Sequence, residues 1–366
     1  ILVQRVDLYY FSGTDQDAHL WIPARGEPLL MVRKSLPRAK KDCLLDHVVP
    51  LAGLSALPEC IGAHTSKALL RVGLEMDILP AKFYEAYGNL FPATEWFDIS
   101  SMVRSLRMVK SPYEMDCIRR AARMADRAYE KVPDFLEKSN TETDLALQLE
   151  AHYRTLGHPG FVRTRTFNME CLYGQVMSGP DAAAPSNSPG PTGGQGFGPF
   201  CSQGAGEGRI RRGEPVLVDY AGNVEGYIAD QARIFVLGPL PVKFQRAHRI
   251  LLEIQSAVAR QGRPGAKAAD LYDLALEMAE RAGLATGFMG FPEPVPFIAH
   301  GVGLEIDEWP VIGKGNPTVL EKGMVLALEP KFVFPSEGVV GIENTFVVAE
   351  NGMEKLNRFP DEIYIV

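Results

Sequence analysis

The sequence predicts an α+β protein with two domains, a smaller amino-terminal α/β domain of residues 1–107 and a larger domain of residues 108–366. Three observations predict this class. Short strand-like runs alternate with helical stretches up to about residue 102, which is typical of a small α/β domain. A capped helix start follows at Ser111. Beyond it, helical periodicities alternate with paired β-rich runs, so we expect a sheet covered by helices.

The composition is that of an ordinary globular protein, and it narrows the range of possible partners. The 366 residues are 46% hydrophobic and 23% charged, and the net charge of −7 argues against nucleic acid as a partner. No apolar run approaches the roughly 20 residues of a membrane helix, and the amino terminus lacks a signal-peptide pattern. The five cysteines have no paired spacing. We therefore expect reduced thiols and a cytoplasmic protein with no membrane partner.

The first domain offers structural elements rather than chemistry. Strands are expected at residues 18–22 and 28–32, and helices at residues 67–73 and 81–89. This stretch has no obvious catalytic constellation. We therefore expect the functional residues to lie in the second domain.

Four helices are expected in the second domain. The first begins at the capping-box sequence of residues 111–114, which has Pro at the first helical position. The second begins at Thr141, with Asp144 three residues on, and ends near Leu156. Two more are expected around residues 243–261 and 270–282. Their apolar stripes are interpreted as core.

Two pairs of acidic residues lie in predicted β-hairpins. With a turn near residues 224–225, Asp219 and Asp230 would lie opposite each other, with Cβ atoms roughly 5 Å apart. A turn near residue 336 would place Glu329 opposite Glu343 in the same way. Like charges directly opposite on a sheet are destabilising. Since these acids are embedded in apolar runs, we interpret them as ligands of two divalent ions rather than as solvated surface residues.

His300 is a candidate fifth ligand. It is followed by Gly301 and Gly303, which let the backbone approach a ligand closely. The alternative is a hydrogen-bonded core histidine. His300 alone does not decide between the two.

In this order, the motifs resemble the pita-bread metallopeptidase family, which includes prolidase, aminopeptidase P, methionine aminopeptidase and creatinase. The family pattern is Asp, a second Asp eleven residues later followed by x-x-Arg, His-Gly-x-Gly, Glu-Pro and Ile-Glu. It reads here as Asp219, Asp230 with Arg233, His300 to Gly303, Glu329-Pro330 and Ile342-Glu343. Residues 8–13 resemble the amino-terminal strand of the creatinase and prolidase branches, and residues 106–111 resemble their interdomain entry. The resemblance implies a carboxy-terminal pita-bread fold after a creatinase/prolidase-like α/β domain.

The resemblance also implies a centre of two divalent ions. Mn(II) is our first choice, with cobalt, zinc and iron as alternatives, because the ligand set is oxygen-rich with one imidazole. Asp230 and Glu343 would bridge the ions, Asp219 would complete one side, and His300 with Glu329 the other. A hydroxide bridging the metals would attack the amide carbonyl, with Glu329 as proton shuttle. The implied partner is a small peptide, and the implied assembly is a homodimer.

Departures from the family pattern lie near the expected site. Asp307 stands where a substrate-binding histidine is usual, and we assign it to the catalytic set with Glu329 and His300. Ser186 replaces another expected histidine and is assigned to substrate binding. Two further departures are Ala232, where Thr is usual, and Gly341, where many aminopeptidase P relatives carry Arg.

Three basic side chains are candidates for substrate binding. Arg163 and Arg165 alternate along an expected strand and would share one face, where guanidinium groups can clamp a carboxylate or phosphate. The alternative is a solvated basic edge. Lys331 follows Glu329-Pro330, where relatives often have Gly, and is assigned a similar purpose. The glycine-rich residues 189–208 lack the Gly-Lys-Ser/Thr of a phosphate loop and are interpreted as an irregular loop that shapes substrate access.

The leading prediction is a dinuclear metal-dependent hydrolase of the Xaa-Pro peptidase type, which cleaves the bond before proline in dipeptides or short peptides. One alternative keeps the metals but hydrolyses or eliminates at a non-peptide C–N bond, as the departures at Ser186 and Asp307 suggest. Another is a non-catalytic binding module. The retention of all five ligand positions argues against that last class.

Overall fold

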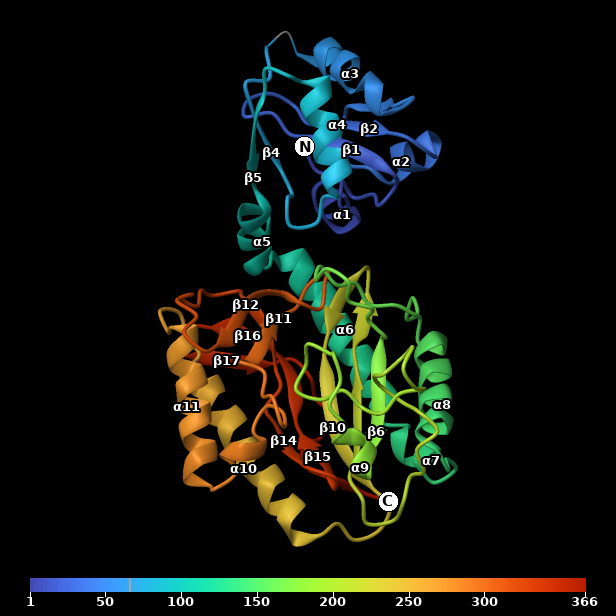
Figure 1. Cartoon of the computed structure of the whole chain (residues 1–366), viewed down its shortest axis with the longest axis vertical. Helices are drawn as coiled ribbons and strands as arrows, with labels where there is room; N and C mark the ends of the chain where they lie inside the picture. The colour runs from blue at the N-terminus through green and yellow to red at the C-terminus, as the bar shows by residue number, and fades with distance from the viewer. Residues whose placement is uncertain (66) are drawn as a thin grey trace. The chain divides into compact units, whose positions relative to one another are not determined.

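The computed structural model describes residues 1–65 and 67–366, which form two compact units, Ile1–Leu106 and Arg107–Val366 (Figure 1). The division falls one residue before the predicted boundary. Each unit has its own sheets and its own hydrophobic core. Among the described residues, no helix combines the length and apolar character needed to cross a membrane.

The amino-terminal unit contains two small sheets. In one, β1 (Ala18–Trp21) pairs antiparallel with β2 (Leu29–Val32), and β2 pairs parallel with β3 (Val48–Pro50). In the other, β4 (Arg71–Leu74) pairs parallel with β5 (Glu95–Asp98). The helices are α1 (Arg5–Ser12), α2 (Leu36–Asp42), α3 (Leu57–His64), α4 (Ala81–Leu90), the 3-10 turn η1 (Leu54–Ala56), and α5 (Ser100–Met108), which reaches the unit boundary. The predicted strands at 18–22 and 28–32 and the helix at 81–89 are confirmed.

Two expectations for this unit are wrong. Residues 8–13 lie in α1 and its cap rather than in a strand. The Gln4 side chain accepts a hydrogen bond from the Asp7 N–H at the start of α1, and Gly13, with φ 81°, ends it in the left-handed conformation. Residues 71–73 belong to strand β4 and not to a helix. Their partner β5 is distant in the sequence, so local periodicity could not reveal the pairing.

The second unit is built on a nine-stranded sheet. Its main path runs β12-β11-β13-β16-β10-β7-β6, with β17 paired to β16 and β18 to β10. Two separate hairpins, β8–β9 and β14–β15, extend from this framework. The strands are β6 (Gly174–Ser178), β7 (Val216–Tyr220), β8 (Gly222–Val224), β9 (Tyr227–Ala229), β10 (Gln231–Val236), β11 (Phe297–Gly301), β12 (Glu308–Gly313), β13 (Val325–Leu328), β14 (Lys331–Phe334), β15 (Gly338–Gly341), β16 (Glu343–Ala349), β17 (Gly352–Lys355) and β18 (Tyr364–Ile365).

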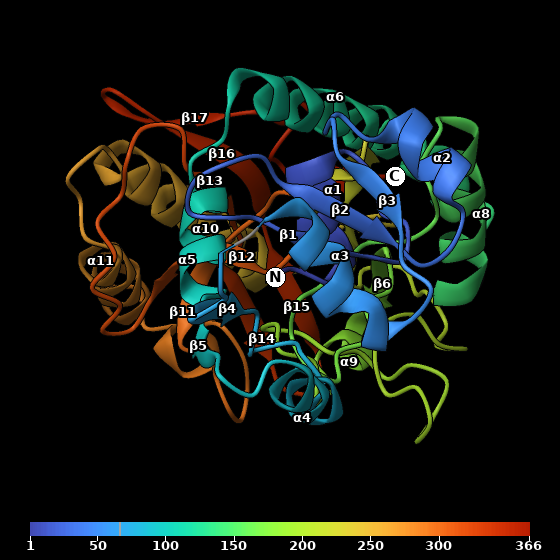
Figure 2. The same cartoon turned by 90° about the horizontal axis from the view of Figure 1, so that it is seen from above.

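Helices flank this sheet, with α10 and α11 near β12 and β17 and α7 and α8 near β6 (Figure 1), while α6 runs past β8 and β9 (Figure 2). The four predicted helices are confirmed as α6 (Pro112–Tyr129), α8 (Glu142–Thr155), α10 (Val242–Gln261) and α11 (Ala268–Arg281). Capping boxes start α6 at Ser111 and α8 at Thr141, as predicted. The shorter elements are α7 (Val132–Leu136), α9 (Gly179–Ala182) and the 3-10 turn η2 (Ala285–Gly287). The expected apolar stripes pack in the core, where Ile118, Leu149, Leu251 and Ala275 are fully buried.

The pairing predicted for the first acidic pair is displaced by two residues. Asp219 of β7 lies opposite Ala232 of β10, not opposite Asp230. The expected single strand is broken at Asp230, because the chain on either side of the turn at Glu225 and Gly226 folds into its own hairpin, β8–β9. Asp230 still lies on the same side as Asp219, since strand residues two apart share a face.

The second acidic pair lies in the register that was predicted. Leu328 faces Asn344 in the main sheet, and Lys331 faces Gly341 in the β14–β15 hairpin. Glu329 and Glu343 lie between these two pairings. They therefore stand across from each other where β13 passes into β14 and β15 passes into β16.

Candidate metal centre

Five acidic and imidazole side chains from different strands meet at one point in the second unit. Asp219 comes from β7 and Asp230 from the junction before β10, while His300 lies on β11. Glu329 and Glu343 stand at the two strand junctions described above. Asp230, Glu329 and Glu343 are buried, whereas Asp219 and His300 are partly exposed. All five predicted ligand positions are thus brought together.

One side of this cluster has the character of a metal site. One ligand atom each from Asp230, His300 and Glu343 lies within 4.8 Å of the others. The Nε2 atom of His300 is 3.8 Å from Glu343 Oε1 and 3.5 Å from Glu329 Oε1. Carboxylate oxygens with one imidazole suit a divalent transition-metal ion. These residues fit one such ion.

The other side of the cluster is filled by Lys331. Its Nζ atom donates a hydrogen bond of 2.6 Å to Glu329 Oε2 and one of 3.0 Å to Glu343 Oε2, and lies 3.3 Å from Asp219 Oδ2. Only 1% of the Lys331 side chain is exposed. The ammonium group that was assigned to substrate binding therefore lies among the predicted metal ligands.

Burial and neighbouring charges together shift the pKa values of the cluster residues, some upwards and some downwards. Burial raises the pKa of Asp219 to about 7, although Lys331 opposes this shift. Burial also acts to raise the pKa of Glu343, but Lys331 and His300 outweigh it and lower that pKa to about 2. Burial would lower the pKa of Lys331, but the adjacent carboxylates raise it well above its ordinary value. Lys331 is therefore a fixed positive charge at this site.

Arg233 holds the strands that carry the cluster. Its side chain is fully buried, and its N–H groups donate to the carbonyls of Ala232 and Glu343 and to the side chains of Asn344 and Asp361. These bonds tie β10, which follows Asp230 directly, to β16, which begins at Glu343. The x-x-Arg position of the motif is thus a positioning residue.

Tyr129 has a similar role on the other side of Asp230. Its hydroxyl accepts a hydrogen bond of 3.0 Å from the Tyr220 N–H and donates towards the carbonyls of Val218 and Gln231. It therefore links β7 to β10 next to the two aspartates. From the sequence this residue is only one member of an apolar helical stripe, so its role could not have been found without the structure.

Asp307 is engaged by the residues of a neighbouring loop. Its carboxylate accepts hydrogen bonds from the N–H groups of Arg165 and Thr166 and from the hydroxyls of Thr164 and Thr166. These bonds hold the pKa of Asp307 below its ordinary value, although burial opposes them. Asp307 thus fastens the loop of residues 163–168.

The loop that carries Arg163 and Arg165 is irregular, so the strand expected there is wrong. The two guanidinium groups differ in environment. Arg165 is buried, with Nη1 4.0 Å from Glu305 Oε2, whereas Arg163 is half-buried and stacks over Phe161 at 5.3 Å. The predicted shared face is absent, and Arg163 is the more accessible of the two.

Ser186 lies on the wall of a cavity. Its hydroxyl accepts a hydrogen bond of 3.1 Å from the Ser188 N–H, and the cavity has a volume of about 480 Å³. Residues 290–295 and Val333 also line this cavity. Val333 belongs to β14, two residues after Lys331, so the cavity adjoins the strand that leaves the cluster.

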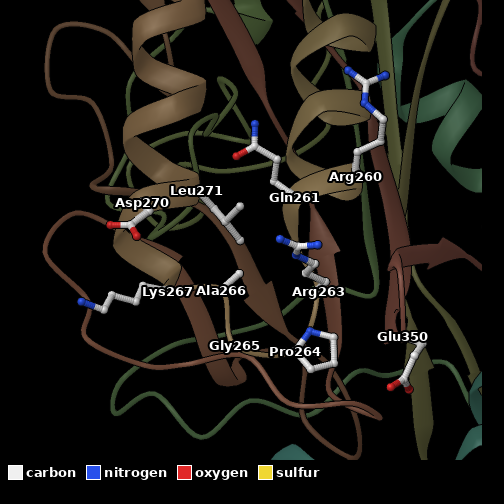
Figure 3. A pocket seen from close by; sticks show the side chains of 10 residues that line it. All are labelled: Arg260, Gln261, Arg263, Pro264, Gly265, Ala266, Lys267, Asp270, Leu271 and Glu350. Carbon is white, nitrogen blue, oxygen red and sulfur yellow. The ribbon is translucent and has the colours of Figure 1, made fainter.

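A larger hollow of about 850 Å³ lies where α10 ends and α11 begins (Figure 3). Arg260, Arg263 and Lys267 line it together with Asp270 and Glu350. None of the cluster residues lines this hollow. Its size therefore does not make it the catalytic pocket.

Cys171 is a neighbour of the site that sequence reasoning did not select. Burial raises the pKa of its thiol to about 12, and the charges of Asp230, Asp307 and Asp219 add to this effect. Cys171 packs against a small apolar cluster of Val162, Ala221 and Ile228. It lies in an irregular segment, where no periodicity or motif marks it.

Comparisons with known proteins agree with this architecture. Residues 116–350 match the model of Metallopeptidase family M24, and residues 1–109 match that of the Creatinase/Prolidase N-terminal domain. The chain therefore belongs to metallopeptidase family M24. This confirms the predicted family and its fold.

Individual relatives match over long stretches of the chain. The chain is 26% identical over 366 residues to the Xaa-Pro dipeptidase of Pyrococcus furiosus, covering 99% of this chain and 94% of the relative. It is 30% identical over 268 residues to the probable dipeptidase PepE of Mycobacterium tuberculosis, covering 73% and 63%. Among solved structures, prolidase from Pyrococcus furiosus superposes with a TM-score of 0.78 at 26% identity, covering 98% and 95%. The X-Pro aminopeptidase of Thermotoga maritima, at 23% identity and a TM-score of 0.83 with 99% and 94% covered, shares the fold.

Proposed function

We propose that this chain is a divalent-metal-dependent hydrolase that cleaves the bond before proline in dipeptides or short peptides. The observation that carries the proposal is the convergence of four carboxylates and His300 in one largely buried cluster. Such a cluster is costly to bury without strong cations, so it points to chemistry rather than to stability. Further support comes from the Pyrococcus furiosus relative, which is named a Xaa-Pro dipeptidase.

Asp230, His300 and Glu343 are the residues proposed to hold the metal ion. Mn(II) is the proposed ion because oxygen ligands predominate, with cobalt, zinc or iron as alternatives that geometry and availability decide. A bound divalent ion supplies a Lewis acid that polarises a carbonyl group and lowers the pKa of water. The proton transfers and substrate contacts belong to the side chains of the protein.

Glu329 is proposed to carry the proton. Burial raises its pKa, although Lys331 opposes the shift, so the protonated form is more accessible than in an ordinary glutamate. Its two oxygens face His300 Nε2 at 3.5 Å and Lys331 Nζ at 2.6 Å. A carboxyl group in this position can take a proton from the attacking water and deliver it to the departing amine.

The substrate-side residues are proposed to divide into contact and positioning roles. Arg163 is proposed to bind the carboxylate of a short peptide, since its half-buried guanidinium group belongs to the loop fastened by Asp307. Asp307 and Arg165 are proposed to hold that loop in place. Ser186 is proposed to contact substrate from the wall of its cavity.

A panel of peptides tests the function. Mn(II)-loaded protein is expected to hydrolyse Xaa-Pro dipeptides or short Xaa-Pro peptides and to leave matched Xaa-Ala peptides uncleaved. Glu329→Gln is expected to lower kcat by about 100-fold or more, because it removes the proposed proton carrier. The preferred peptide length separates a dipeptidase from an aminopeptidase. Cleavage of Xaa-Pro and Xaa-Ala at equal rates would contradict the proline preference.

A second candidate function is hydrolysis or elimination at a non-peptide C–N bond. The observation that favours it is that a carboxylate, Asp307, stands at the usual histidine position and is engaged by loop residues. A metal-loaded protein that cleaves no peptide of the panel would support this candidate.

We further propose a homodimer located in the cytoplasm. The support is the resemblance to the prolidase branch and the free state of all five cysteines in the structure. Sedimentation analysis at micromolar concentration is expected to give twice the chain mass of 40.2 kDa. A species with the mass of a single chain would contradict the dimer.

A further inference from the structure

Lys331 lies where a metal ion would contact several carboxylates at once. Its ammonium nitrogen is within 2.6 to 3.3 Å of one oxygen from each of Glu329, Glu343 and Asp219. These three acids come from separate parts of the sheet. An ion bound by the same three oxygens would need metal–oxygen distances of roughly 2.0 to 2.2 Å and would have to take the position of the nitrogen.

The backbone places Lys331 in this position. It is the first residue of β14, directly after Glu329-Pro330, and pairs with Gly341 of β15 in the hairpin visible in Figure 1. A Cβ atom on Gly341 would lie 2.6 Å from the Lys331 Cγ atom. The absence of a side chain at Gly341 therefore makes room for the lysine stem. The two departures from the family pattern at 331 and 341 fit each other.

Glu343 is the proposed metal ligand that also contacts Lys331, through Oε2, while its Oε1 faces His300 Nε2 at 3.8 Å. In the part of the chain that the structure describes, no hydrogen bond or ion pair joins Lys331 to Asp230 or His300. Glu343 can therefore offer Oε1 to an ion held together with Asp230 and His300, while its Oε2 and the carboxylates of Glu329 and Asp219 keep their contacts with Lys331. One half of the cluster is built for a metal and the other for an ammonium group.

The net charge of the cluster also favours one metal ion together with one ammonium group. Four carboxylates and one ammonium group leave three negative charges, which one divalent ion reduces to one. A second divalent ion beside Lys331 would make the cluster net positive. Without the lysine, two divalent ions would balance the four carboxylates. The lysine thus supplies positive charge that a second ion would otherwise supply to offset the carboxylates.

We propose that the ammonium group of Lys331 takes the place of the second metal ion, so that each chain binds one divalent ion, at Asp230, His300 and Glu343. This inference rests on the metal-binding part of the proposed function and not on the choice of substrate. It assigns Lys331 a role as a built-in cation of the site, which differs from the two-ion centre that the family resemblance implies.

Metal stoichiometry tests the proposal directly. The full chain is stripped with a chelator, titrated with Mn(II), freed of excess metal, and its metal content measured per chain by mass spectrometry. Wild-type protein is expected to retain one ion, and Lys331→Ala two. Lys110→Ala is the matched control, because Lys110 is also a buried lysine paired with a glutamate, Glu308 at 3.0 Å, outside the cluster. This control is expected to retain one ion.

Thermal unfolding provides a second measurement, which applies even if a variant folds poorly without metal. In thermal unfolding, Mn(II) is expected to raise the Tm of Lys331→Ala more than that of the wild type or of Lys110→Ala. Only in Lys331→Ala would a second Mn(II) ion replace the ammonium group that the substitution removes. Equal shifts in all three proteins would overturn the proposal. So would two ions in the wild type, or one ion in Lys331→Ala. Protein that binds no metal in any form would instead overturn the proposed function.

Discussion

Asp230 and Asp307 show how residues of one type, both close to the site, acquire different roles. Asp230 is buried among other acids, and burial together with Glu343 and Asp219 raises its pKa well above the ordinary value. Asp307 is held as a carboxylate by backbone and hydroxyl donors. The first arrangement needs a cation, whereas the second is satisfied by its own loop. This difference can be tested with the same substitution at both positions.

Asp230→Asn is expected to weaken Mn(II) binding by more than the roughly 10- to 100-fold that loss of an outer partner of a metal ligand costs, because it removes a direct ligand. Isothermal titration with Mn(II) measures the effect. An affinity equal to that of the wild type would exclude Asp230 from the metal site.

Asp307→Asn is expected to leave Mn(II) affinity unchanged and to loosen the loop of residues 163–168. An amide accepts fewer and weaker hydrogen bonds than a carboxylate, so the N–H groups of Arg165 and Thr166 lose part of their support. Limited proteolysis is expected to cut this loop faster in the variant, and KM is expected to rise more than kcat falls. A loss of metal would show that Asp307 acts at the cluster instead.

The strand elements divide into those that local sequence predicts and those that it does not. The register around Glu329 and Glu343 follows from one hairpin turn and was predicted. The register around Asp219 was not, because the turn at Glu225 and Gly226 belongs to a separate hairpin and the strand breaks at Asp230. The β4–β5 pairing joins segments distant in the sequence, which no local pattern reveals.

The β14–β15 hairpin gives a prediction at this scale. Gly341→Ala is expected to destabilise the protein by about 1 to 3 kcal/mol, because the added Cβ would lie 2.6 Å from Lys331 Cγ inside a packed region. Denaturant unfolding measures the change. Gly88→Ala is the control, since Gly88 lies in α4 with nothing within 4 Å of an added Cβ, and it is expected to stabilise by about 0.5 to 1 kcal/mol. A neutral Gly341→Ala would mean that the lysine stem shifts freely.

The second unit contains a further buried ion cluster. Arg107 Nη1 lies 2.9 Å from Glu305, its Nη2 2.5 Å from Glu308, and Lys110 Nζ 3.0 Å from Glu308. Burial alone would raise the pKa of Glu308, but Lys110 and Arg107 outweigh it and lower that pKa to about 2. The folded state therefore holds this carboxylate ionised more strongly than the unfolded chain does.

This cluster predicts how stability depends on pH. Because the pKa of Glu308 is lower in the folded state than its ordinary value of 4.5, its contribution is fully present above about pH 4.5 and is lost as the pH falls towards 2. The contribution is on the order of 3 kcal/mol. Denaturant unfolding from pH 7 to 3 is expected to show the larger part of this loss in the wild type. Glu308→Gln is expected to be less stable at pH 7 and flatter over that range, and an unchanged slope would contradict the assignment.

At the scale of the molecule, the sequence was sufficient for the two-unit layout, the four long helices and the convergence of the five proposed ligand residues. Spacing along the chain carries that information. The sequence was not sufficient to predict which side chains surround each proposed ligand. The entry of Lys331 into the cluster depends on the space above Gly341, and the engagement of Asp307 depends on an irregular loop. Both are tertiary contacts between segments that no shared periodicity connects.

The measurement that tests the central claim most directly is the rate of Xaa-Pro dipeptide hydrolysis as Mn(II) is added stepwise to metal-free protein. The account predicts no hydrolysis without metal, a rise in rate that follows the occupancy of the site formed by Asp230, His300 and Glu343, and complete loss on chelation. Hydrolysis that is independent of metal would contradict this account. So would the absence of hydrolysis of every Xaa-Pro peptide at full metal occupancy.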